Sequence, residues 1–143
     1  MNYKKKDRIV IIVAIIMANL YGSTKYEDSQ ILNLLENYFK SNSQIIKLGA
    51  NIYTEKTKRV FQLEISSKEG EVEKNLVTAF IALYKISSYA EYHIQKLKLI
   101  VHLDHYDVPL IALCNYNCIE KYISDYNLDE KEWRNNCLII KSL

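Results

Sequence analysis

The stretch VEKNLVTAFIALYKISSYA, residues 72–90, decides the fold, because it predicts a long helix between two pairs of strands. Its apolar residues recur three or four positions apart, a spacing that places them on one side of a helix. Just before it, Ser66 and Glu69 have the spacing of a capping box. The sequence therefore predicts a long helix with one buried face. The stripe consists of Val72, Leu76, Ala79, Leu83, Ile86 and Ala90, with Phe80 widening it.

A β-hairpin is predicted on each side of this helix, because apolar and polar residues alternate there with the period of a half-buried strand. The hairpin before the helix turns at 54–57, and the one after it turns at 104–107. Pro109 cannot donate a ladder hydrogen bond, so the strand over 108–114 is expected to lie at a sheet edge or to begin at that residue. The alternating apolar residues are Ile46, Leu48, Ala50, Ile52, Phe61, Leu63, Ile65, Leu97, Leu99, Val101 and Leu103.

Further helices are predicted before the first hairpin and after the second. Asp28 and Ser29 precede a stripe that runs from Ile31 to Phe39. Asn117 with Glu120, and Asp129 with Glu132, repeat the capping-box spacing, and 138–140 reads as a short closing strand. We therefore expect residues 24–143 to be a single α+β domain. Two helix–hairpin (αββ) units would form a four-strand antiparallel sheet with helices packed on one face.

The N-terminal 23 residues have the pattern of a targeting segment. Basic residues within 1–8 precede ten apolar residues, IVIIVAIIMA, at 9–18. A basic start followed by a short apolar core is typical of a signal peptide, and an uncleaved signal anchor fits because no A-x-A cleavage site follows. We therefore expect residues 1–23 to be a signal peptide or signal anchor that contacts the membrane. The membrane segment would include Ile9, Ile12, Ile16 and Leu20.

The net charge of +2 is divided unevenly along the chain. Residues 1–23 carry a net charge of +3, and residues 24–143 carry −1. Lysines that precede an apolar segment tend to stay in the cytoplasm, so the body is expected outside, either secreted or anchored to the cell membrane. A body with this charge balance argues against a nucleic-acid partner. The alternative is a cytoplasmic α/β protein in which 9–18 is a buried strand.

The densest group of metal-ligand residues lies in the turn HLDHYD. Imidazole and carboxylate groups suit zinc and other transition metals. Asp is also an ordinary turn residue, and no distant ligand is marked to complete a site. We therefore expect no metal or other cofactor, with His102, Asp104, His105 and Asp107 as weak candidates that belong mainly to the cytoplasmic alternative.

Three cysteines, Cys114, Cys118 and Cys137, are candidates for a disulfide if the body is exported. Cys114 and Cys118 form a C-x3-C pair, which differs from the C-x2-C of redox and zinc motifs. Any of the three pairings leaves one free thiol. Three buried free cysteines are the alternative.

No nucleotide-binding, metalloprotease or hydrolase motif occurs in the chain, and no pair of carboxylates is marked for acid–base chemistry. The chain has twelve tyrosines, and exposed tyrosines are common on binding surfaces, but the chain is also rich in Ile, Lys and Asn, which favours composition and core packing as their origin. The sequence therefore predicts a module that is not an enzyme and that binds a partner protein or a cell-surface component.

Overall fold

The long helix predicted over 72–90 is α3, Val72–Ser87, in a computed structural model that describes residues 24–41, 44–124 and 127–142. Leu76, Phe80 and Leu83 on its stripe are fully buried. The described elements are, in chain order, α2 Asp28–Ser41, β1 Ile46–Glu55, β2 Lys58–Ser67, the 3-10 turn η1 Glu69–Glu71, α3, β3 Lys96–Leu103, β4 Leu110–Asn115, α4 Tyr116–Glu120, β5 Ile123–Ser124, β6 Asn127–Leu128, α5 Glu130–Cys137 and β7 Ile139–Ser142.

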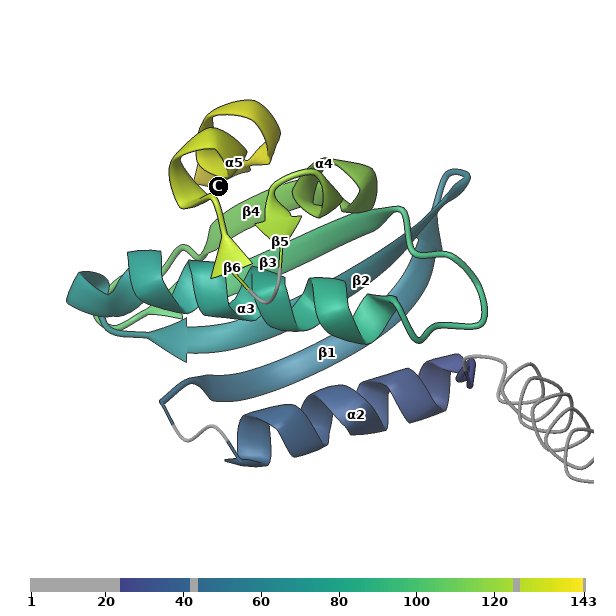
Figure 1. Ribbon diagram of the computed structural model, residues 1–143. Coiled ribbons are helices and arrows are strands. Elements are labelled where there is room, and N and C mark those ends of the chain that lie inside the picture. The colour runs from purple at the N-terminus through teal and green to yellow at the C-terminus, as the bar shows by residue number, and fades with distance from the viewer. Residues whose placement is uncertain (1–23, 42–43, 125–126, 143) are drawn as a thin grey trace, which may run out of the picture.

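The main sheet has five strands in the order β1-β2-β3-β4-β7, and it is mixed. Both predicted hairpins are present as antiparallel pairs, but β2 and β3 run parallel. The expected four-strand antiparallel sheet is therefore wrong. The reason is that α3 carries the chain back across the sheet between β2 and β3, so both strands point in the same direction (Figure 1).

The fifth strand, β7, pairs antiparallel with β4. It shares Ile139 and Ile140 with the closing strand predicted at 138–140 and extends to Ser142. Because β7 covers the outer side of β4, the return strand of the second hairpin is not at an edge. Pro109 lies just before Leu110, the first residue of β4, where its missing N–H costs no ladder bond.

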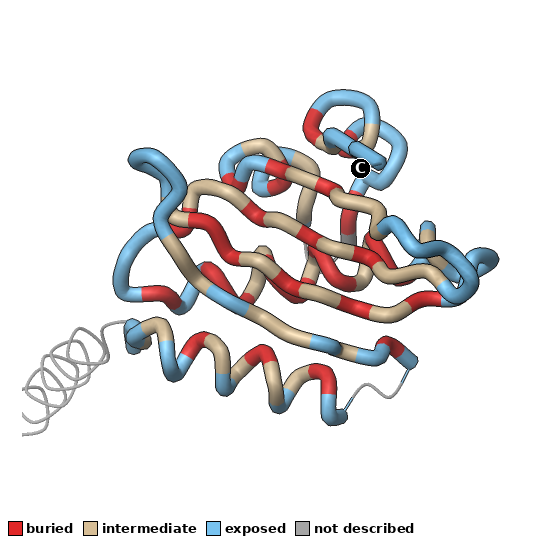
Figure 2. Tube along the Cα trace, turned by 180° about the vertical axis from the view of Figure 1, so that it is seen from behind, coloured by how far each residue is buried: buried red, intermediate tan, exposed pale blue. Residues whose placement is uncertain are grey.

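The helices α2, α3, α4 and α5 pack on one face of this sheet (Figure 1). The strand residues facing them are fully buried, and they alternate with half-buried residues on the other face (Figure 2). The buried set from β2 and β3 is Phe61, Leu63, Ile65, Leu97, Leu99 and Val101. None of the described helices lies on the opposite side of the sheet, which we call the open face.

A β-bulge between Lys47 and Gly49 interrupts the alternation predicted for β1. It turns Lys47 toward α2, where its ammonium lies 2.6 Å from a carboxylate oxygen of Glu36. Ile46 and Leu48, which were expected on the buried face, are 63% and 54% exposed. A bulge adds a residue to one strand and so reverses which side chains face the core.

The predicted caps have different outcomes. Asp129 caps α5, because its carboxylate accepts a hydrogen bond from the backbone N–H of Glu132. Ser66 lies inside β2 and caps no helix, so that prediction is wrong. The helix expected to open at Asn117 is the five-residue α4, which follows β4 without a break and begins at Tyr116.

The N-terminal end of α2 is attached to the loop after α3 by backbone hydrogen bonds. Tyr26 N–H donates to the carbonyl of Tyr89 at 2.8 Å, and Glu91 N–H donates to the carbonyl of Tyr26 at 2.9 Å. These bonds form an isolated parallel bridge between Tyr26 and Ala90. The side chain of Lys25 adds a hydrogen bond to the carbonyl of Ser88.

The expectations for residues 1–23 lie outside the described residues. They concern the membrane segment with Ile9, Ile12, Ile16 and Leu20, and the alternative strand over 9–18. Among the residues that are described, no helix combines the length and the hydropathy needed to cross a bilayer.

The two-residue turn between β1 and β2 places Lys56 at a φ of 57°, a left-handed conformation that costs a residue with a Cβ about 1 kcal/mol or more. Lys56→Gly is therefore expected to be more stable than Lys56→Ala by about 1 kcal/mol. Both variants remove the charged side chain, so their difference isolates the backbone. The measurement is urea unfolding followed by the fluorescence of Trp133, the only tryptophan. Equal midpoints would contradict the prediction.

Candidate functional site

The open face of the sheet carries polar and apolar side chains in rows that cross the strands. The pairing of β2, β3, β4 and β7 places Lys98 between Gln62 and Leu113, with Ile139 beyond. The next row has Glu64, Ile100, Ile111 and Lys141 in the same strand order. The face is therefore polar over β1 and β2, and it mixes lysine with aliphatic side chains over β3, β4 and β7.

A shallow groove of about 520 Å³ crosses this face. The end of the β1–β2 hairpin turns out of the plane of the sheet and forms one wall (Figure 2). Ile111 and Leu113 of β4 form an apolar floor. Five lysines line the groove beside a single carboxylate, so its charge is strongly positive. They are Lys56, Lys58, Lys96, Lys98 and Lys141, and the carboxylate is Glu55.

The lysines of the groove differ in their partners. Lys96 Nζ lies 3.0 Å from Glu55 Oε2, and this hydrogen bond holds the pKa of the Glu55 carboxyl below its usual range. Lys98 Nζ donates to the hydroxyl of Tyr53 at 3.5 Å. Lys58 and Lys141 are exposed and form no ion pair within the residues that the structure describes. Part of the positive charge is therefore free to meet a ligand.

A chain of polar contacts runs along β1, β2 and β3 beside the groove. The Tyr53 hydroxyl donates to Gln62 Oε1 at 3.2 Å, and Gln62 Nε2 donates to Glu64 Oε1 at 3.0 Å. The second oxygen of Glu64 lies 3.4 Å from His102 Nε2. The two hydrogen bonds fix Tyr53, Gln62 and Glu64 on this half of the open face, whereas His102 Nε2 has no hydrogen-bond partner among the described residues.

The candidate metal ligands of the HLDHYD turn are dispersed. His102 lies near the end of β3, on the open face, whereas Asp104, His105 and Asp107 are exposed in the loop before β4. His105 has a φ of 74°, as expected for a residue in a tight turn. Within residues 24–41, 44–124 and 127–142, no three His, Cys, Asp or Glu side chains gather as metal ligands.

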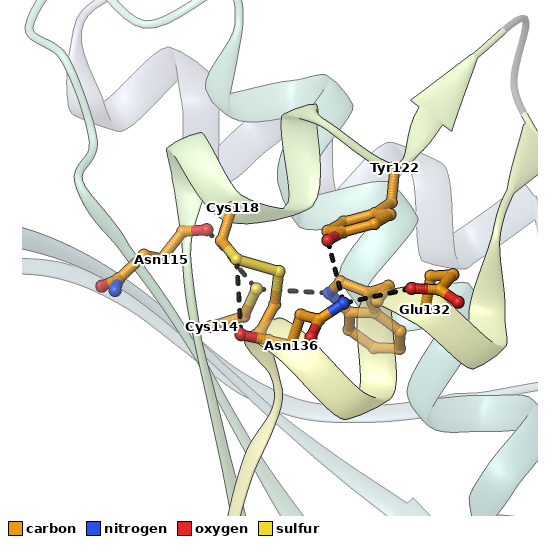
Figure 3. The surroundings of a disulfide bond; sticks show 8 residues. Cys114, Asn115, Cys118, Tyr122, Glu132 and Asn136 are labelled. Carbon is orange, nitrogen blue, oxygen red and sulfur yellow. Dashed lines mark hydrogen bonds between the residues drawn. A yellow bond between two sulfur atoms is a disulfide. The ribbon is translucent and has the colours of Figure 1, made fainter.

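The cysteines lie on the helix-covered face, where Cys118 of α4 and Cys137 of α5 form a disulfide (Figure 3). Their Cα atoms are 5.6 Å apart, and the residues are 19 positions apart in the chain. Of the three pairings that the sequence left open, the structure contains this one and leaves Cys114 reduced. The disulfide therefore links two short helices that follow β4.

The free thiol of Cys114 is buried beside Trp133. The indole N–H of Trp133 donates to Cys114 Sγ at 3.3 Å, and the indole packs edge-on against Phe80 of α3. Burial raises the pKa of the Cys114 thiol above its usual range, so the thiol stays protonated and unreactive. Burial and the contact with Trp133 give Cys114 a packing role.

The tyrosines do not gather in one patch. Tyr84 and Tyr116 stack on each other at 5.0 Å between α3 and α4, and burial raises the pKa of Tyr116 to about 12. Tyr89 and Tyr92 are exposed near the start of α2, where Arg59 lies over the ring of Tyr92. The aromatic side chains therefore mark no single binding surface among the described residues.

Sequence reasoning missed the groove because its lysines come from separate parts of the chain. Lys96 and Lys98 alternate along one strand, but the acidic residues Glu91 and Asp104 flank them in sequence. The other lysines arrive through the β1–β2 turn and through β7. The usable sequence signal was the position of Lys96 and Lys98 on the polar side of a predicted strand.

Comparisons with known proteins identify no relative of this chain. No protein-family model, no curated protein and no solved structure matches the chain.

The disulfide is expected to stabilise the fold by about 3 kcal/mol, because it closes a loop of this length in the unfolded chain. Changing Cys118 and Cys137 to serine together should lower the free energy of unfolding by that amount. Reductant should destabilise the wild type equally and leave the double variant unchanged. Cys114→Ala is the matched control, since it retains the response to reductant. A wild type that is insensitive to reductant would contradict the prediction.

Proposed function

We propose that the protein is an exported or membrane-tethered α+β module without enzymatic activity. It binds a partner protein or a cell-surface component. The binding surface is the open face of the sheet, and the groove there is the observation that carries the proposal. Its lysines lie away from the hydrophobic core that holds the fold together, so they are available for another molecule.

The proposed location outside the cytoplasm rests on two independent features. Residues 1–23 combine a net charge of +3 with the apolar run at 9–18, as targeting segments do. The disulfide between Cys118 and Cys137 is of a kind that persists in oxidising compartments and is rare in the cytosol. Both features favour a body that folds after export.

A binding role fits the chemistry of the described side chains. Glu55, the carboxylate in the groove, is engaged by Lys96 and is held ionised by it, which suits a structural ion pair better than proton transfer. The thiol of Cys114 is buried and protonated, which suits packing better than nucleophilic attack. The groove is open and shallow, as surfaces that bind chains or other proteins are.

A reporter enzyme that is active only outside the cytoplasm, fused after Leu143 of the full chain, tests the location. We expect activity from this fusion. The matched control carries Ile12→Asp and Ile16→Asp, which interrupt the apolar run and should abolish activity without altering residues 24–143. Equal inactivity of both fusions, at equal protein levels, would contradict export and favour the cytoplasmic alternative.

A further inference from the structure

Positive charge is concentrated on one face of a body that has almost no net charge. Residues 24–143 carry a net charge of −1, yet the groove brings five lysines together beside one carboxylate. Among the described residues only Lys96 is paired with that carboxylate, and like charges held close together oppose folding, so the fold does not account for the remaining lysines of the cluster. Charge complementarity therefore points to an anionic ligand.

The lysines surround the ligand space on several sides. Lys58 is at the hairpin end that forms one wall, Lys96 and Lys98 rise from β3, and Lys141 stands on β7 at the far side. A lysine ammonium is a flexible point charge, whereas arginine has a planar fork that matches one phosphate or carboxylate. The groove therefore suits several separate carboxylates better than a single tightly oriented anion.

The floor of the groove adds a second requirement. Leu113 lies next to Lys98, and Ile111 lies next to Lys141, so apolar side chains lie directly beside positive ones on this face. A bare polyanion would leave these half-buried aliphatic groups uncovered. Because the hairpin end forms a wall of the groove, a flat membrane surface would meet it before it reached the floor. Both observations favour a chain with acidic and apolar side chains.

We infer that the groove binds an extended acidic segment of a partner protein, in which carboxylates alternate with apolar side chains. The carboxylates pair with the lysines of the walls, and the apolar side chains cover Ile111 and Leu113. From β2 to β7 the groove spans three strand spacings of about 4.8 Å, or roughly 14 Å, which accommodates about four extended residues. This inference rests on the proposed function, because it names the partner of the same surface.

The test measures the binding of a fluorescent heptapeptide of alternating Glu and Val to the purified full chain in nanodiscs of uncharged lipid, by anisotropy. We expect saturable binding that weakens several-fold between 50 and 500 mM salt. A Lys–Val heptapeptide should not bind. A Glu–Gly heptapeptide, which has the charges without the apolar groups, should bind several-fold more weakly.

Two groove variants and a matched control locate the site. Lys58→Glu with Lys141→Glu should weaken binding of the Glu–Val peptide at least tenfold, because both residues are exposed and reversal turns attraction into repulsion. Lys68→Glu with Lys131→Glu makes the same change in net charge at exposed positions outside the groove and should leave binding unchanged. Leu113→Thr should weaken binding of the Glu–Val peptide several-fold and should hardly change binding of the Glu–Gly peptide.

Each other outcome overturns the inference. Equal loss in both charge variants means that net charge alone attracts the peptide. Tighter binding of inorganic polyphosphate, or of vesicles with anionic lipid, assigns the face to a different ligand class. Saturation by a second copy of the chain, seen as a dimer by light scattering, assigns it to self-association. Absence of binding at millimolar peptide excludes acidic peptide segments as ligands of the groove. The export experiment separately decides the location of the protein.

Discussion

The packing of α3 across β2 and β3 is the constraint on which the rest of the structure depends. The apolar stripe of α3, with Leu76, Phe80 and Leu83 fully buried, covers the strands on one side only. Because the same helix returns the chain to the starting end of the sheet, β2 and β3 become parallel neighbours. α2 then packs beside α3, and α5 packs through Trp133 against Phe80. The other face is left to solvent as a consequence.

The sequence predicted the elements better than their arrangement. Helical spacing in 72–90 and alternation in the two hairpins are local patterns, and α3 and the four hairpin strands follow them. Alternation of apolar and polar residues identifies a strand but does not specify its direction in the sheet. The parallel pairing of β2 and β3 was therefore missed. The bulge between Lys47 and Gly49 adds one residue to β1 and so changes which side chains face the core. The alternation in the sequence does not reveal this change of register. The groove was missed for the same reason as the sheet order, since Lys58 and Lys141 come to line the same groove only after the strands assemble.

The two faces of the sheet differ in the side chains that they carry. The face under the helices holds the core, the disulfide and the buried thiol of Cys114, whose protonated state keeps it from competing for Cys118 or Cys137. The open face contributes little to that core and carries the charge. Substitutions at Lys58 or Lys141 therefore change the charge of the groove without affecting the interactions that keep the molecule folded.

The parallel bridge at Tyr26 has a mechanical consequence. Tension transmitted along the chain from residues before 24 reaches the folded body first at Lys25 and Tyr26, where two backbone hydrogen bonds and the Lys25 side chain join the segment to 88–91. The force is then transmitted by two routes, through residues 88–91 to the end of α3 and along the chain into α2. The helix that organises the sheet is therefore loaded twice in a body held at that end, through the hydrogen bonds of Lys25 and Tyr26 and through its packing against α2.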